Sequence, residues 1–198
     1  MQFQKFFKKY NKSIFDLLDK FDTDLIEQSV MLIDKCRKQG GKVYIVGNGG
    51  SSSIASHVSV DFAKVAGVPS DTFNNANLIT CFANDYGHDN WVSEAIKAYT
   101  NEKDMLVLIS SSGTSKNIVN AASYCNDKHI PLITLSGFKS DNPLSKLGNV
   151  NMHVESDSYN FIEMSHHIIL VSIVDIFCSK ISFIKLSPTE SLIYSFFI

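Results

Sequence analysis

The sequence predicts an α/β fold in which helices cover both faces of a parallel β-sheet. Short apolar runs at residues 42–46, 104–110 and 131–136 have the length and composition of buried strands. Each run is followed by a polar turn and a helical stretch, and strands that alternate with helices form parallel sheets. A single core serves a chain of 198 residues. We therefore expect one domain over residues 1–183 and a C-terminal tail, residues 184–198, whose role the sequence leaves open.

Two helices are predicted before the first strand, over residues 4–21 and 22–39. In the first, Phe7, Ile14 and Leu17 recur on one helical face. A pair of glycines follows the second and is typical of a helix C-terminus.

The later part of the chain predicts a helix over residues 89–100, a further strand at 150–154 and a long apolar helix over 160–181. Within that last helix, the most apolar region, residues 168–177, is interrupted by Ser172 and Asp175. This region is too short to span a bilayer, so no membrane is expected as a partner.

Charge and cysteine content narrow the class of protein. The formal net charge is −2 and there is no basic run, so nucleic acid is not an expected partner. Cys36, Cys81, Cys125 and Cys178 are widely spaced, without a C-x-x-C pair, and are typical of reduced thiols. No signal segment opens the sequence. We expect a cytoplasmic protein.

A glycine-rich turn follows the first predicted strand: Gly47-Asn48-Gly49-Gly50-Ser51. In open parallel sheets, ligands bind beyond the carboxyl ends of the strands, where this turn lies. The turn lacks the third glycine of a dinucleotide motif and the Gly-Lys-Ser/Thr ending of a P-loop. Dinucleotides and nucleoside triphosphates are therefore not the expected ligands.

A serine-rich turn follows the second predicted strand: Ser110-Ser111-Ser112-Gly113-Thr114-Ser115. Hydroxyls and free N–H groups at a helix N-terminus, where the helix dipole favours negative charge, can bind a phosphate without a lysine. The alternative is an ordinary serine N-cap. The run of hydroxyls favours a phosphomonoester site.

His57 and Asp61 are four residues apart in a predicted helix and so project from one face. A carboxylate and an imidazole on one face can act as a base and an acid in proton transfer. The alternative for such a pair is a surface hydrogen bond.

Four motifs together resemble the sugar isomerase (SIS) domains, and among them the phosphoheptose isomerases: "GNGGSSSIASH", "ANDYG", "SSSGTSKNI" and "IEMSHH". The resemblance implies a three-layer fold around a five-stranded parallel sheet, a homotetramer with sites at subunit interfaces, and a sugar phosphate as ligand. It implies that Ser110, Ser111, Ser112 and Ser115 bind the phosphate, and that Asn48, Gly49, Gly50, Ser51, Asn84 and Asp85 contact the sugar.

The sequence departs from the family pattern at two acid/base positions. Asp61 stands where the family has a glutamate base, and Val171 stands where the family has a second histidine in the last helix. His167 lies one helical turn before Val171 and Glu163 lies two turns before it, on the same face. We therefore expect Glu163 in the place of a family glutamine that contacts the substrate, and His167 as a compensating acid.

His57, Asp61, Glu163 and His167 then form an expected metal or acid/base cluster, with zinc as the candidate ion. The alternative is that His166 and His167 only pack against neighbouring helices.

The expected function is isomerisation of a ketose phosphate to an aldose phosphate through an enediol, with Asp61 as base. By the resemblance, the substrate is sedoheptulose 7-phosphate and the product, D-glycero-D-manno-heptose 7-phosphate, serves the synthesis of bacterial lipopolysaccharide or capsule. Two alternatives stay open. One is a non-catalytic SIS regulator, such as a replication-initiator-associating protein, and the other is an isomerase of a different sugar phosphate.

Overall fold

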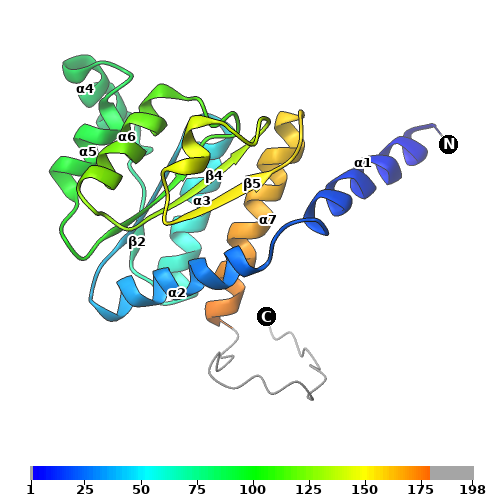
Figure 1. Cartoon of the computed structure of the whole chain (residues 1–198), viewed down its shortest axis with the longest axis horizontal. Coiled ribbons are helices and arrows are strands. Elements are labelled where there is room, and N and C mark those ends of the chain that lie inside the picture. Colours follow the sequence, from blue (N-terminus) through cyan, green and yellow to red (C-terminus); the bar gives the residue numbers. More distant parts are fainter. Residues whose placement is uncertain (1, 179–198) are drawn as a thin grey trace.

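The computed structural model describes residues 2–178, so the expected 184–198 tail lies outside the described residues. Its centre is a five-stranded sheet in the order β2-β1-β3-β4-β5, and every pair of neighbouring strands is parallel (Figure 1). The strands are β1 (Val43–Gly47), β2 (Ser70–Asp71), β3 (Met105–Ile109), β4 (Leu132–Gly137) and β5 (Val150–Val154). The expected α/β fold with a five-stranded parallel sheet is confirmed.

Helices cover both faces of this sheet and make it a three-layer sandwich (Figure 1). Alternate residues of a strand point to opposite faces, so Ile45 and Val107 pack in one core and Val46 and Leu108 in the other. The first core is closed by α2, α3 and α7, and the second by α5 and α6. The helices are α1 (Gln2–Leu18), α2 (Asp24–Lys38), α3 (Gly50–Lys64), α4 (Ala76–Tyr86), α5 (Trp91–Tyr99), α6 (Lys116–Asp127), the short 3-10 helix η1 (Pro143–Lys146) and α7 (Tyr159–Cys178).

Two elements, β2 and α4, were not placed from the sequence, and the helical stretch expected after residues 131–136 is only the short 3-10 helix η1. The edge strand β2 is only two polar residues long, and its pairing with β1 is what makes it a strand. Helix α4 buries none of its residues fully. Its N-terminus is nevertheless capped, because the Asn75 side chain accepts a hydrogen bond from the N–H of Leu78.

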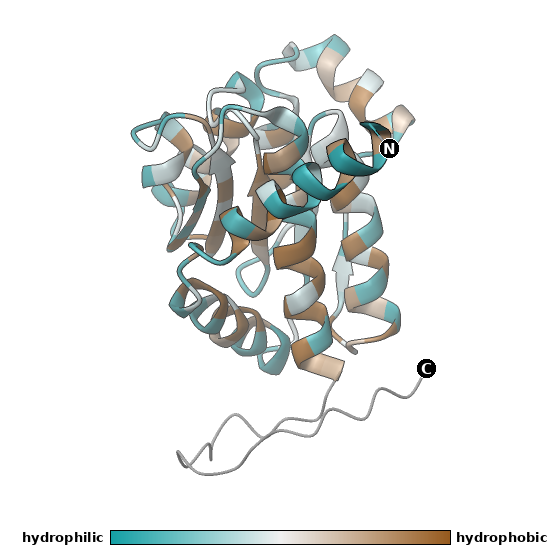
Figure 2. Ribbon diagram, turned by 90° about the vertical axis from the view of Figure 1, so that its right-hand side faces the viewer, coloured by the Kyte–Doolittle hydropathy of each residue, from teal (hydrophilic) through white to brown (hydrophobic). Residues whose placement is uncertain are grey.

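Helix α7 is the core helix of one face. Among the described residues it is also the one helix long and apolar enough to cross a membrane. It is longer than residues 168–177, the apolar run that the sequence analysis found too short to span a bilayer. Seven of its side chains are buried, including Ile162, Ile169 and Ile173, and it is largely brown near the centre of Figure 2. The helix contacts α1, α2, α3 and the strands β4 and β5, so its apolar face packs within the domain.

Helix α1 extends away from the sandwich (Figure 1). None of its side chains is buried, and Phe3, Phe6, Phe7 and Phe15 are 62–87% exposed. Tyr10 packs edge-on against Phe161 of α7, with ring centroids 4.9 Å apart. The aromatic face of α1 is therefore left without a covering surface in a single chain.

Candidate functional site

The glycine turn is fixed where β1 ends and α3 begins. Gly47 is the last residue of β1, and the Asn74 side chain holds it from the side: Nδ2 donates to the Gly47 carbonyl at 2.8 Å and Oδ1 accepts from the Gly47 N–H at 3.2 Å. Gly49 has φ = +54°, a conformation that favours glycine. The turn therefore reaches the α3 N-terminus in one tight bend. Within residues 2–178, the N–H groups of Gly50 and Ser51 have no acceptor.

The serine turn has the features of an anion site. The Ser110 hydroxyl donates to Ser115 Oγ at 3.0 Å, and Ser115 makes no capping bond with its side chain. In the described part of the chain, the backbone N–H groups of Ser111, Ser112 and Ser115 have no acceptor. Gly113, with φ = +66°, turns the chain between them. The ordinary N-cap alternative is therefore not what the structure shows, and both hydroxyls and N–H groups remain for an anion.

The two turns are neighbours at the carboxyl edge of the sheet. Asn48 and Asn117 exchange two side-chain hydrogen bonds of 2.9 Å, and the hydroxyl oxygens of Ser51 and Ser111 lie 3.5 Å apart. Because β1 and β3 pair directly, their following turns open at the same place. The structure thus brings the expected phosphate and sugar positions together.

Asn84 and Asp85 lie elsewhere in the chain. They are exposed near the end of α4, where Asn84 Nδ2 donates to Asp85 Oδ1 at 2.9 Å. Their predicted contact with a sugar stays a prediction.

Helices α3 and α7 run side by side in the same direction. The carboxylate of Glu163 lies against Gly50 at the start of α3, since an added Cβ on Gly50 would meet its Cδ at 2.6 Å. Further along, His57 faces His167, and near the ends Phe62 packs against Phe177 with ring centroids 6.2 Å apart. The pairing explains how three expected site residues from two distant segments come to lie along one helix interface.

Asp61, His57 and His167 form a hydrogen-bonded chain. His57 Nε2 lies 3.1 Å from Asp61 Oδ2, and His57 Nδ1 lies 2.7 Å from His167 Nε2. One assignment of protons satisfies both bonds: His57 donates from Nε2 to the carboxylate, and His167 donates from Nε2 to His57 Nδ1. Burial, and then the neighbouring His57, lower the pKa of His167 and outweigh the opposite effect of Asp61. His167 is therefore mostly neutral near pH 7.

These side chains have the chemistry of zinc ligands but are not placed as a metal site. Both ring nitrogens of His57 already face protein partners. Within residues 2–178, no three His, Cys, Asp or Glu side chains form a group that could hold a metal ion. As placed, the four expected ligands therefore do not fit a metal. Asp61 is also about 16 Å along α3 from Gly50, at 1.5 Å per residue. Because the Glu163 carboxylate lies against Gly50, these two expected ligands are far apart.

His166 is a packing residue, as one sequence alternative proposed for both histidines. It is fully buried, and Nε2 donates to the carbonyl of Ser136 at 3.0 Å. This bond ties α7 to β4. His167, one residue later, points instead to His57, so the two adjacent histidines have different roles.

Sequence reasoning missed three asparagines that organise the site: Asn74, Asn117 and Asn142. Asn142 is buried, and its Nδ2 donates to the carbonyl of Lys139 at 2.7 Å while its Oδ1 accepts from the Ser145 N–H. The side chain lies against Gly113. A buried amide has no distinctive sequence signal, because its partners come from segments far apart.

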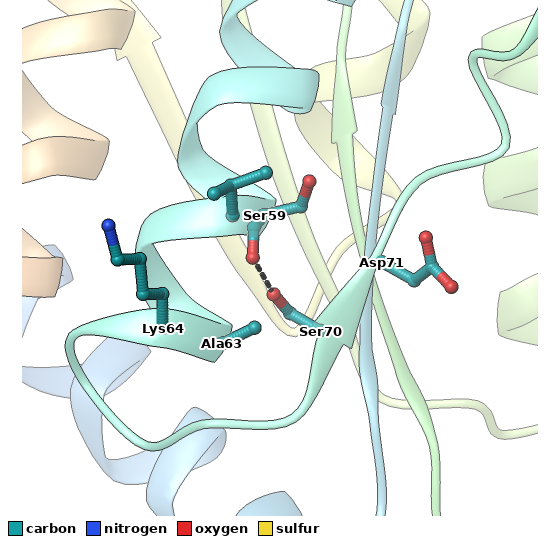
Figure 3. A pocket seen from close by; sticks show the side chains of 6 residues that line it. Ser59, Ala63, Lys64, Ser70 and Asp71 are labelled. Carbon is teal, nitrogen blue, oxygen red and sulfur yellow. Dashed lines mark hydrogen bonds between the residues drawn. The ribbon is translucent and has the colours of Figure 1, made fainter.

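Two hollows of the surface lie away from these turns. One, of about 340 Å³, is lined by residues of α3 and β2 (Figure 3), where the Ser70 hydroxyl donates to the Ser59 carbonyl. The other, of about 400 Å³, lies beside Tyr44 near the start of β1 and includes Phe73 and Tyr99. Neither contains a residue that the sequence predicted for the site.

The fold, with a glycine turn and a serine turn on adjacent parallel strands, defines a sugar-phosphate-binding class of domain. The SIS-domain family matches residues 6–137, and the chain belongs to this family.

Within the family, its similarity is to phosphoheptose isomerases. It is 33% identical to phosphoheptose isomerase 1 of Campylobacter jejuni over 153 residues, 73% of this chain and 81% of the relative. It is 28% identical to the phosphoheptose isomerase of Syntrophotalea carbinolica over 165 residues, 80% of this chain and 84% of the relative.

Solved structures share the fold. The phosphoheptose isomerase of Neisseria gonorrhoeae superposes with a TM-score of 0.79 at 22% identity, covering 88% of this chain and 99% of that one. The NanR protein of Vibrio vulnificus, solved with ManNAc-6P, superposes with a TM-score of 0.66 at 16% identity, covering 86% of this chain and 59% of that one. At these identities the likeness shows the fold alone.

Proposed function

We propose that the protein is an aldose–ketose isomerase that converts sedoheptulose 7-phosphate to D-glycero-D-manno-heptose 7-phosphate. One observation carries the proposal: an anion site made of hydroxyls and N–H groups lies beside the N-terminus of α3, the helix that carries the carboxylate and one imidazole of a hydrogen-bonded carboxylate–imidazole chain. Relatives of about 30% identity that carry the name phosphoheptose isomerase support it. The product would supply heptose for bacterial lipopolysaccharide or capsule.

Substrate binding begins at the serine turn. Ser110, Ser111, Ser112 and Ser115 hold the phosphate with hydroxyls and with the N–H groups that have no acceptor in the described chain. The helix dipole of α6 favours the negative charge. Binding energy from the phosphate, remote from the reacting carbons, then positions the sugar beside the glycine turn.

The chemical step moves one proton between adjacent carbons. Asp61 removes a proton from C1 of the ketose while the C2 oxygen gains one, which produces the enediol. Return of a proton to C2, with loss of the C1 hydroxyl proton, then gives the aldose, so atoms balance without an oxidant or reductant. His57 holds the Asp61 carboxylate through its 3.1 Å contact, and His167, with its Nε2–H turned from His57 to the substrate, supplies and recovers the oxygen proton.

The proposal includes a bound zinc ion, but it assigns no step of the reaction to that ion. A bound ion would polarise the substrate carbonyl as a Lewis acid. His57, Asp61, Glu163 and His167 would hold it only if the two imidazole rings turned away from each other, because they now face each other at 2.7 Å. Metal analysis of the purified protein tests this part directly.

We also propose a cytoplasmic homotetramer. The exposed phenylalanines of α1 and the 46%-exposed Ile168 of α7 form apolar surface that a second copy could cover. The distance along α3 between Gly50 and Asp61 gives a second reason, because residues from a neighbouring subunit would then complete the site. Light scattering after size-exclusion chromatography would give the mass.

A sugar-phosphate-binding regulator is the second candidate. The NanR structure carries the same fold and was solved with a sugar phosphate. The altered positions Asp61 and Val171 also favour this candidate, since both are departures on the catalytic face of the family.

A proton NMR time course in deuterated water separates the two candidates. Sedoheptulose 7-phosphate is incubated with the wild type, with Asp61→Asn, and with Asp127→Asn, which makes the same change on the exposed end of α6. The isomerase produces aldose with deuterium at C2 in the wild type and in Asp127→Asn, and Asp61→Asn stops it. Saturable binding without exchange in any of the three proteins would establish the regulator instead.

A further inference from the structure

The carboxylate of Glu163 lies directly beside the first residue of α3. An ideal Cβ on Gly50 would contact three atoms of this carboxylate, with Oε1 at 2.7 Å and Cδ at 2.6 Å. Only glycine leaves space for the carboxylate in this position. Glu163 makes no hydrogen bond in the described chain, so it is held there by the packing of α7 on α3 rather than by a capping bond.

The two helix N-termini of the site therefore differ in charge. The α3 N-terminus carries the Glu163 carboxylate next to the free N–H groups of Gly50 and Ser51. The α6 N-terminus is surrounded by hydroxyls, and its first residue, the exposed Lys116, pairs with Asp89 at 3.4 Å. A helix N-terminus attracts anions, but a fixed carboxylate at the same place repels them.

We propose that Glu163 determines specificity by reserving the α3 N-terminus for sugar hydroxyls and excluding a second phosphate. The inference rests on the proposed function, because it assigns the phosphate of the substrate to the serine turn. A hydroxyl can donate to the carboxylate and accept from the N–H groups of the glycine turn, whereas a phosphate dianion can only accept. The substrate is then held in one direction, and sugars with a phosphate at both ends are rejected.

The test is a comparison of two dissociation constants, measured by isothermal titration calorimetry on the full chain. The probes are sedoheptulose 7-phosphate and sedoheptulose 1,7-bisphosphate. We expect the wild type to bind the bisphosphate at least about tenfold more weakly than the monophosphate, the size of effect expected for like charges a few ångströms apart at a partly exposed position. In Glu163→Gln, which keeps the shape and removes the charge, the two constants should become nearly equal.

Glu102→Gln is the matched control, because it removes the same charge from an exposed loop between α5 and β3. Glu102→Gln should bind the bisphosphate more weakly than the monophosphate, by the same factor as the wild type. Glu163→Ala serves as a second variant and should lose discrimination as the glutamine variant does, with circular dichroism checking that each is folded. Ser111→Ala should weaken both ligands alike, since both place a phosphate on the serine turn.

Three results would overturn the inference. The first is an unchanged ratio in both Glu163 variants, and this would leave the isomerase proposal standing. The second is a wild type that binds the bisphosphate as tightly as the monophosphate. The third is a wild type that binds neither compound, which would end the proposed function together with the inference.

Discussion

Protonation of His166 should destabilise the folded protein as the pH falls below neutral. The imidazole is fully buried on α7 and donates from Nε2 to the Ser136 carbonyl, while its Nδ1 has no partner in the described chain. Burial lowers the pKa of His166 from 6.5 to about 4, an effect only partly offset by the Ser136 bond and increased by the neighbouring His153. The folded state therefore accepts a proton much less readily than the unfolded chain does.

The sign and size of the effect follow from proton linkage. Because the pKa of this base is depressed by folding, the unfolded state gains its proton first as pH falls below 6.5. Stability from neutral His166 is complete above 6.5 and is lost progressively down to about pH 4. The full loss is about 3 kcal/mol, at about 1.4 kcal/mol for each tenfold difference in proton affinity. Between pH 7 and pH 5 it is about 2 kcal/mol.

Urea unfolding at pH 7 and pH 5 measures this difference, at one protein concentration and with the same buffer ions. His166→Gln keeps a donor for the Ser136 carbonyl and cannot titrate. Its free energy of unfolding should therefore fall by about 2 kcal/mol less than that of the wild type between these pH values. His88→Gln, an exposed loop position, is the matched control and should behave as the wild type does.

An equal pH dependence in the wild type and His166→Gln would refute the reasoning. The acid sensitivity would then arise from other groups, among which His153 also has a pKa lowered mainly by burial.

Three further predictions concern the turns. Asn74→Ala removes both side-chain hydrogen bonds to the backbone of Gly47, at the buried end of β1, and should lower the free energy of unfolding in urea by about 2–4 kcal/mol. Asn77→Ala on exposed α4 should lower it much less. Ser111→Ala should weaken sugar-phosphate binding about tenfold or more in calorimetry, with exposed Ser140→Ala as the unchanged control. Gly113→Ala forces a side chain into φ = +66° and against the Asn142 amide, so we expect a loss of about 2–4 kcal/mol and a weaker phosphate site.

Each of these has a result that would contradict it. Equal stabilities of Asn74→Ala and Asn77→Ala would mean that the β1 end finds other partners, such as water. Full affinity in Ser111→Ala would place the phosphate elsewhere. A Gly113→Ala protein with unchanged unfolding free energy would show that the turn can adopt a different conformation without cost.

The sequence by itself determined the sheet and the positions of both turns. Apolar runs such as residues 105–109 are buried over their whole length, so composition alone marks them as central strands. The strand at residues 150–154 was placed with its observed bounds. The spacing of His57 and Asp61 fixed their common helical face, because four residues make about one helical turn, and the structure joins them at 3.1 Å.

Only the tertiary structure decided which distant residues meet. The register of α7 on α3 puts Glu163 against Gly50 and His167 against His57, and it turns adjacent His166 into the core instead. The two-residue strand β2 also exists only through its pairing with β1. Local sequence encodes period and burial, but the partner of a side chain more than a hundred residues away depends on how helices pack on the finished sheet.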